Sequence, residues 1–139
     1  MEEISTIGKR FLTSRKRGER DAVMFDIDET LVKTMSGKPI TPIISLFHTS
    51  HALGYKTVII TARPGFSSNI RHTKEQLGDL GIAPDYLIFT DAEKKSIAKK
   101  RTRFNYVLSV GDQDTDIGET EKWIKLPSFF DKNIYSNIK

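Results

Sequence analysis

The sequence contains no cysteine among its 139 residues. This absence excludes disulfide bonds, thiolate zinc sites and a cysteine nucleophile. The sequence also has no apolar run that approaches the length of a membrane-spanning helix. Residues 1–20 are charged throughout and lack the pattern of a signal peptide. We therefore expect an intracellular, cytoplasmic protein with no membrane partner.

Positive charge is in modest excess, and it is unevenly distributed along the chain. The formal net charge is +4, and residues 1–20 contribute +3 of it through six Lys or Arg and three Glu. With 37% hydrophobic and 29% charged residues, the chain is long enough for one domain with a core. We expect a basic N-terminal helix and linker segment, residues 1–20, followed by one main domain, residues 21–139.

A second basic group lies in the second half of the chain. Its members are Lys94, Lys95, Lys99, Lys100, Arg101 and Arg103. Such runs attract anionic substrates or nucleic acid, but they more often form the solvated face of a helix, and we favour that interpretation here. We also expect Trp123 and the phenylalanines to lie in the core.

Residues 22–31 carry the strongest functional signal. Ala22 to Phe25 form an apolar run that predicts a buried strand of a parallel sheet. The run ends in Asp26 and Asp28, whose side chains share one face of an extended segment and can converge beyond the strand. Two crowded carboxylates cost free energy unless a cation or a reacting group compensates them. The pair indicates a nucleophile, a metal ligand or a proton shuttle; the alternative is a cap on a following helical turn.

Strand patterns alternate with helical patterns along the rest of the chain. The expected helices are residues 3–13, 41–53, 66–80, 90–103 and 117–122. The expected strands are residues 22–25, 56–61, 86–89, 106–110 and 123–126, with a hairpin or flap at 32–40 and an irregular tail from 127. Thr41 is the expected N-cap of its helix, with Pro42 at the first helical position. This alternation predicts an α/β fold with a doubly wound, mainly parallel five-stranded sheet.

Polar residues follow three of these strands, at the edge where open α/β sheets bind ligands. Asp26 and Asp28 follow the first strand, Thr61 ends the second, and Asp112 and Asp116 follow the fourth. Carboxylates from two strands form an all-oxygen site that suits Mg²⁺. A lysine from the helix before the fourth strand can hold phosphate oxygens. An EF-hand loop starting at Asp112 is excluded, since its sixth and twelfth positions are not Gly and Glu.

These motifs resemble those of the haloacid dehalogenase (HAD) superfamily. Residues 26–30, Asp-Ile-Asp-Glu-Thr, are similar to its first motif, D-x-D-x-T, and Thr61 lies where the second motif has Thr or Ser. Residues 111–116, Gly-Asp-Gln-Asp-Thr-Asp, look like the fourth motif, G-D-x-x-x-D. The sequence most resembles the class B (subfamily IIIB) acid phosphatases, which share G-D-Q and a later K-L-P segment, here residues 125–127. The resemblance covers residues 22–130 and implies a HAD-like Rossmannoid fold.

The resemblance further implies a Mg²⁺-dependent phosphatase, a phosphoric monoester hydrolase with a phosphoaspartyl intermediate. Asp26 would attack phosphorus, and Asp28 would protonate the leaving oxygen and then deprotonate the hydrolytic water. The third-motif lysine is Lys95, with Lys94 and Lys99 as alternatives. The implied catalytic residues are Asp26, Asp28, Thr61 and Lys95, and the implied phosphate-binding residues are Thr30, Thr61, Ala62, Arg63 and Lys95. The implied metal ligands are Asp26, the backbone carbonyl of Asp28, Asp112 and Asp116, the last as a ligand or as support.

The substrate and the partners stay open at this point. The connections at residues 31–41 and 89–95 are too short for a large cap domain, so the resemblance implies an open site. An open site admits bulky phosphorylated substrates or is covered by a second copy of the chain. Asp114 replaces the bulky aromatic residue that class B enzymes have after G-D-Q, which argues against a shared substrate preference. Two alternatives remain: a nucleic-acid end phosphatase or nucleotidase that uses the basic segments, and a catalytically inactive HAD-like binding module.

Overall fold

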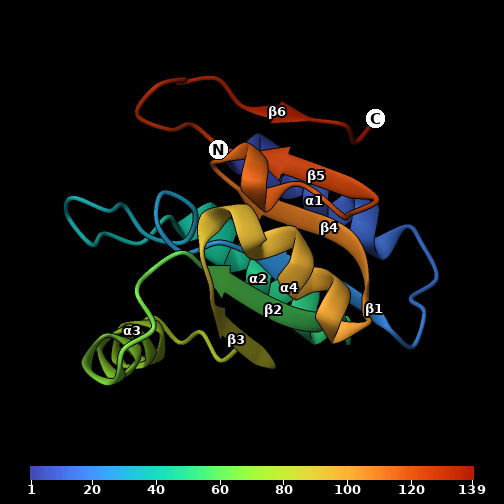
Figure 1. Cartoon of the computed structure of the whole chain (residues 1–139). Coiled ribbons are helices and arrows are strands. Elements are labelled where there is room, and N and C mark those ends of the chain that lie inside the picture. The colour runs from blue at the N-terminus through green and yellow to red at the C-terminus, as the bar shows by residue number, and fades with distance from the viewer.

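The computed structural model describes the whole chain, residues 1–139, and Figure 1 shows its elements. Six strands form one sheet: β1 (Asp21–Phe25), β2 (Lys56–Thr61), β3 (Tyr86–Phe89), β4 (Asn105–Gly111), β5 (Lys122–Lys125) and β6 (Tyr135–Ser136). Four α-helices accompany it: α1 (Glu2–Thr13), α2 (Thr41–Ala52), α3 (Ser67–Asp79) and α4 (Lys95–Thr102). Two 3₁₀ turns, η1 (Ala92–Lys94) and η2 (Asp114–Asp116), follow β3 and β4. None of the helices has the length and apolar character that crossing a membrane requires.

The sheet has the strand order β3-β2-β1-β4-β5-β6. β1 to β5 pair in parallel, and only β6 is antiparallel to its neighbour. The predicted α/β class with a mainly parallel sheet is therefore confirmed. The predicted count of five strands is wrong, because the tail adds β6. Polar side chains hold this strand: the Ser136 hydroxyl donates to the Trp123 carbonyl (2.7 Å), and Asn137 Oδ1 accepts the Trp123 N–H (2.8 Å).

β1 is buried along its whole length. Val23 and Phe25 belong to a large core cluster that includes side chains of α1 and α2, whereas Ala22 and Met24 belong to a smaller cluster beside α4. Alternate residues of a strand point to opposite faces of the sheet, so apolar layers cover both faces of β1. This double coverage is why the strand is a continuous apolar run rather than an alternating one.

The N-terminal helix predicted from the amphipathic pattern is present as α1. It packs against α2 and buries Ile4 and Leu12 in the large core cluster. The two helices approach closely at Gly8, where a Cβ atom would lie 3.0 Å from the Leu46 side chain. The Tyr55 hydroxyl donates to the Leu12 carbonyl at 2.9 Å. α1 is thereby fixed to the core of the sheet domain.

The N-terminus of α2 differs from the prediction. The helix includes Thr41, and Ile40 is its N-cap residue. The Ile40 carbonyl accepts the N–H groups of Ile43 (3.0 Å) and Ile44 (3.1 Å). The N-cap role predicted for Thr41 is therefore wrong, and the buried Ile40 side chain anchors this end of the helix instead.

The connection after β4 also differs from the prediction. The helix expected at residues 117–122 is absent. The 3₁₀ turn η2 lies earlier in the chain, at Asp114–Asp116, and β5 begins at Lys122. The N–H of Gln113 donates to the Asp116 carboxylate at 3.1 Å, a capping interaction that fixes this earlier turn. β5 then pairs with β4 from Lys122 onward, and residues 117–121 connect η2 to this strand without forming a helix.

The flap expected at residues 32–40 is present as a single antiparallel bridge between Val32 and Pro39. Gly37 turns the chain with a φ of 71°, a left-handed conformation that glycine adopts without steric cost. The connection from β1 to α2 holds this flap and no further domain, and residues 90–91 lead directly from β3 into η1. The carboxyl edge of the sheet is therefore left open.

Candidate functional site

Side chains from several element ends meet at the carboxyl edge of the parallel strands. They surround a cavity of about 330 Å³. Its charged lining includes Asp26, Asp28, Arg63, Lys95 and Asp112. All five were predicted as site residues, and the fold brings them together around one cavity.

Asp26 lies directly after β1, beside two other carboxylates. Its N–H donates to the Val110 carbonyl of β4 at 3.0 Å, which fixes the backbone where the chain leaves the sheet. Carboxylate oxygens of Asp26, Asp112 and Asp116 lie within 4.8 Å of one another, and all three residues are buried. This set of oxygens suits a hard divalent cation. We call these three residues the acidic cluster.

Burial and mutual repulsion shift the ionisation of the acidic cluster. Burial, together with the charge of Asp116, raises the pKa of Asp26 well above its usual range, and Lys95 only partly opposes the shift. Burial also raises the pKa of Asp112. A buried carboxyl group favours its neutral form unless positive charge lies nearby. Lys95 alone does not offset the cost of ionising all three carboxyl groups in this buried space.

Lys95 is the cation at the centre of the site. It begins α4 and is only 3% exposed. Its Nζ donates to Asp26 Oδ1 at 3.0 Å and to Asp116 Oδ1 at 2.6 Å. Burial lowers the pKa of Lys95, but the two carboxylates more than reverse this effect, so its pKa is raised. Of the three lysines that the sequence left open, Lys95 is the one bonded to the carboxylates; Lys94 is exposed beside Asp91.

Asp116 is held from two sides. One carboxylate oxygen accepts from Lys95, and the other accepts the N–H of Gln113. Gly111, the last residue of β4, leaves room for this carboxyl group, since a Cβ atom there would collide with Asp116. Only glycine fits at position 111 of the G-D-Q segment, because the Asp116 side chain lies against its Cα atom. Held in this way, Asp116 orients the Lys95 ammonium group toward Asp26.

Lys99 lies one helical turn after Lys95 and is also buried. Its Nζ donates to the Ser109 hydroxyl (3.0 Å) and to the carbonyls of Asp116 (2.7 Å) and Gly118 (2.6 Å). Burial lowers its pKa to about 8. The expectation that the basic group forms a solvated helix face is wrong for these two lysines. The signal that identifies them in the sequence is their spacing of four residues, which places both on one side of a helix.

Asp28 does not join the acidic cluster. Its two carboxylate oxygens accept hydrogen bonds from Arg63 Nε and Nη2, both at 2.9 Å. Arg63 Nη1 also donates to the Thr73 hydroxyl at 3.1 Å, which attaches the arginine to α3. Such two-point pairs have a defined geometry. The Asp28 side chain therefore faces a cation rather than the carboxylates around Asp26.

The remaining predicted residues differ in their access to the cavity. Ala62 lines it, whereas the buried residues Thr30 and Thr61 do not. The Thr61 hydroxyl accepts the N–H of Arg63 at 3.2 Å and so shapes the turn that presents the arginine. The Thr30 hydroxyl is buried without a hydrogen-bond partner. The structure thus supports an indirect role for Thr61 in positioning Arg63.

Glu29 also lines the cavity, although it was not predicted as a site residue. Its φ of 59° is uncommon for a residue other than glycine, and such strain concentrates at functional sites. Its N–H donates to the Val32 carbonyl at 2.7 Å, and its carboxylate accepts the N–H of Thr34 at 2.8 Å. Glu29 therefore ties the acidic turn to the base of the flap.

Phe129 is a second cavity residue that the sequence did not reveal. The expectation that the phenylalanines lie in the core is wrong for Phe66, Phe129 and Phe130, which are 61%, 61% and 95% exposed. The Ser128 hydroxyl accepts the N–H groups of Phe130 and Asp131, which holds the turn that presents both rings. The position of Phe129 after Pro127, in a polar tail without a hydrophobic period, is the sequence signal for exposure.

Comparison with known proteins adds evidence on the fold. No family model and no curated protein matches this sequence. A solved chain of the Pnkp1/Rnl/Hen1 complex has a similar fold, with a TM-score of 0.58 and 19% sequence identity. The similarity covers 72% of this chain and 42% of that chain, so this chain spans less than half of the neighbour's length. A likeness at this identity establishes a shared fold, and the function has to be argued from the site.

Proposed function

We propose that this chain is a HAD-type phosphomonoester hydrolase that uses Mg²⁺ and forms a phosphoaspartyl intermediate on Asp26. The proposal includes the finer assignment of the sheet as a HAD-like Rossmannoid fold with an open site. The observation that carries it is the placement of a buried Asp26 at the end of β1, 3.0 Å from Lys95 Nζ and facing an open cavity. This arrangement suits a carboxylate nucleophile beside a cation that holds phosphate.

The charge of the acidic cluster fits a divalent cation. Asp26, Asp112 and Asp116 place three carboxylates in a buried space, and Lys95 is the one cation bonded to them. Burial is the main cause of the raised pKa values of Asp26 and Asp112, and the charge of Asp116 adds to both. Bound Mg²⁺ would offset the repulsion between Asp26 and a phosphate, which for unit charges about 4 Å apart is about 4 kcal/mol at an effective dielectric constant of about 20.

Asp28 is the proposed acid and base, and Arg63 controls when its carboxyl group is free. The Arg63 guanidinium donates to both Asp28 oxygens. A phosphate group offers the same two-point geometry to a guanidinium, so it competes with Asp28 for Arg63. A phosphate that takes over Arg63 releases the Asp28 carboxylate, which takes up a proton from solvent and donates it to the leaving oxygen. The carboxylate that results then accepts a proton from the hydrolytic water. The pair thus couples substrate binding to proton transfer.

The first test is hydrolysis of an aryl phosphate such as p-nitrophenyl phosphate by the intact protein, with Mg²⁺ and with a chelator. Asp26→Asn should lower kcat by about 10³-fold or more, since it removes the nucleophile. Asp114→Asn is the matched control, because Asp114 lies in the same segment as Asp112 but is exposed and lies outside the cavity. Equal loss in both variants, or turnover that is indifferent to the chelator, would contradict the proposal.

A protein that folds but shows no turnover requires a second measurement. An inactive binding module and an enzyme selective for another substrate would both fail to hydrolyse p-nitrophenyl phosphate. Beryllofluoride with Mg²⁺ mimics a phosphoryl group on an aspartate, and ¹⁹F NMR detects its binding. Binding to the wild type and not to Asp26→Asn supports a competent nucleophile with a selective substrate requirement. Absence of binding to the wild type would overturn the enzymatic proposal.

A further inference from the structure

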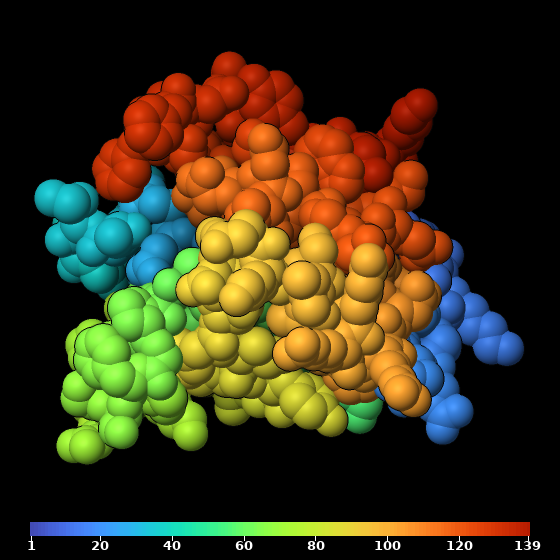
Figure 2. All heavy atoms as spheres, viewed as in Figure 1, coloured from blue at the N-terminus to red at the C-terminus, as the bar shows by residue number.

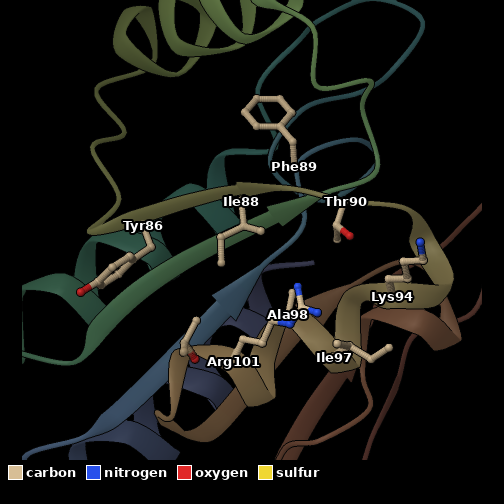
Figure 3. Close-up of a pocket in the computed structure, with 9 residues that line it drawn as sticks. Tyr86, Ile88, Phe89, Thr90, Lys94, Ile97, Ala98 and Arg101 are labelled. Atoms are coloured by element: carbon tan, nitrogen blue, oxygen red, sulfur yellow. The ribbon is translucent and has the colours of Figure 1, made fainter.

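A cavity larger than that of the acidic cluster lies between β3 and α4, with a volume of about 550 Å³ (Figure 3). Tyr86 and Ile88 point from β3 toward α4, whereas Phe89 points away. Figure 2 views the molecule from the side of α4, whose yellow and orange atoms lie toward the viewer. No acidic residue lines the cavity. We define the β3–α4 groove by Tyr86, Ile88, Lys94, Ile97 and Arg101.

The strand that forms one wall of the groove is an open edge. β3 pairs only with β2 and is the last strand on its side of the sheet. Its sequence is Tyr-Leu-Ile-Phe, and none of the four residues is fully buried. Exposed edges usually carry a charge or a proline that blocks pairing with another chain, and β3 has neither. The neighbouring Asp85 does not block the edge, because its carboxylate accepts the N–H and hydroxyl of Thr57 on β2.

The walls of the groove expose large apolar side chains on both sides. Tyr86 on β3 is 48% exposed, and Ile97 on α4 is 49% exposed. Ile88 lies between them, at the margin of the smaller core cluster. Single exposed apolar residues are ordinary, but a cavity that joins them across two elements marks a site of interaction. The groove therefore offers an apolar surface to a partner.

The rim of the groove is basic. Arg101 takes part in none of the ion pairs of the chain. Lys94 lies 3.7 Å from Asp91, but both side chains are more than half exposed, so this pair is weak. Positive charge at the rim attracts an acidic partner and repels a basic one.

We propose that the β3–α4 groove binds an extended acidic peptide segment of a partner protein, which adds to the sheet as a strand beside β3. In this recognition mode, main-chain hydrogen bonds to the open edge supply affinity, and alternate side chains supply specificity. Side chains on the groove face of the added strand lie beside Tyr86 and Ile88, and acidic residues near α4 reach Lys94 and Arg101. The proposal is independent of the hydrolase activity proposed above.

The charge and shape of the groove disfavour two other occupants. A second copy of the chain, paired edge to edge through β3, would bring two basic rims onto one face, and like charges across an interface are destabilising. A single-stranded nucleic acid stacks its bases on several aromatic rings. Of the two aromatic residues that line the cavity, Phe89 points away from α4, and Tyr86 already contacts Phe104 edge to face at 5.3 Å between ring centroids. An acidic peptide matches both the apolar walls and the basic rim.

The test uses short random peptides displayed on phage and selected against the intact protein. The peptides are then synthesised with a fluorophore and titrated by anisotropy against three proteins: wild type, Arg101→Glu and Arg71→Glu. Arg71 is the matched control, because it is an exposed arginine of α3 outside the groove. We expect enriched peptides in which acidic and apolar residues alternate, with affinity weakened about tenfold or more by Arg101→Glu and unchanged by Arg71→Glu. Amide hydrogen exchange in β3 should slow when the peptide is bound.

Several results would overturn the proposal. The selection could enrich no peptide sequence, or it could enrich basic sequences. The selected peptides could also bind all three proteins with equal affinity. Exchange that slows elsewhere than in β3 would place the peptide on another surface. Displacement of the peptide by an unrelated DNA oligonucleotide, or a dimer of the chain that dissociates when β3 is altered by Ile88→Lys, would assign the groove to nucleic acid or to a second copy instead.

Discussion

The acidic cluster and the β3–α4 groove lie on two sides of one short helix, α4. The pattern of burial in this helix is the reverse of the usual one. α4 turns Lys95 and Lys99 inward, where they are 3% and 1% exposed, and leaves Ile97 49% exposed over the groove. An ordinary surface helix buries its apolar residues and exposes its lysines. Burial in α4 follows the available partners rather than hydropathy.

The two regions differ in whether their charged and apolar groups have contacts within the chain. Every buried charge in the acidic site has a specific contact: Lys95 with Asp26 and Asp116, and Lys99 with a hydroxyl and two carbonyls. Such an arrangement costs desolvation and is seldom the most stable solution. In the groove, by contrast, Tyr86 and Ile97 are about half exposed, and Arg101 forms no ion pair. This difference underlies the two proposals above, phosphate chemistry at the acidic cluster and peptide binding in the groove.

Removing the central cation should have the largest effect on stability. Lys95→Met leaves Asp26 and Asp116 buried without their shared donor, and we expect the free energy of unfolding to fall by about 3–5 kcal/mol. Denaturant unfolding followed by circular dichroism measures this. Adding Asp26→Asn to the variant should restore part of the loss, since one buried charge is removed. A loss below about 1 kcal/mol would mean that the contacts around Lys95 carry little energy.

Lys99 should give the protein a pH dependence above neutrality. Its pKa is lowered from the ordinary 10.5 to about 8 by burial, so the unfolded chain binds more protons between these values. The cost of burying the charge is fully present below pH 8 and disappears as the pH rises toward 10.5. The unfolding free energy of the wild type should therefore rise with pH by up to about 3 kcal/mol relative to Lys99→Met. Parallel pH profiles for the two proteins would contradict the assignment.

Mg²⁺ should stabilise the fold through the acidic cluster. At a concentration about a hundredfold above its dissociation constant, it should raise the unfolding free energy by about 2.7 kcal/mol. The effect should shrink as the pH falls, because the raised pKa values of Asp26 and Asp112 let protons compete with the cation. Thermal unfolding with Mg²⁺ and with EDTA measures this shift. Asp112→Asn should reduce it, whereas Asp131→Asn, an acidic residue outside the cluster, should leave it unchanged.

Truncating the groove should have the smallest effect on stability. Ile97→Ala removes a half-exposed side chain, so we expect a change below about 0.5 kcal/mol in the free energy of unfolding. Ile60→Ala, in the buried strand β2, is the matched comparison and should cost about 2–5 kcal/mol. Denaturant unfolding of the two variants measures both. A large loss in Ile97→Ala would show that the groove is part of the core rather than a free surface.

Much of the fold and part of the site follow from local patterns. The apolar run before Asp26, the β-branched run before Thr61 and the glycine of the G-D-Q segment each mark a strand end by short-range chemistry, and the structure places all three at the same edge. The predictions failed where the deciding contact is distant. The segment expected to be a helix at residues 117–122 is held by distant groups instead: Lys99 Nζ donates to the Gly118 carbonyl, and the Glu121 N–H donates to the Tyr106 carbonyl. β6 forms through polar contacts without a hydrophobic period.

By itself, the sequence determined the α/β class, the mainly parallel sheet and the positions at which carboxylates leave the strands, because these depend on residues close together in the chain. The tertiary structure alone decided which lysine meets Asp26, from a position 69 residues away, and that Asp28 pairs with Arg63, 35 residues away. It also decided that α4 buries lysines and exposes an isoleucine. The physical reason is that a charge is buried where opposite charges and carbonyls converge, and convergence is a property of the folded chain.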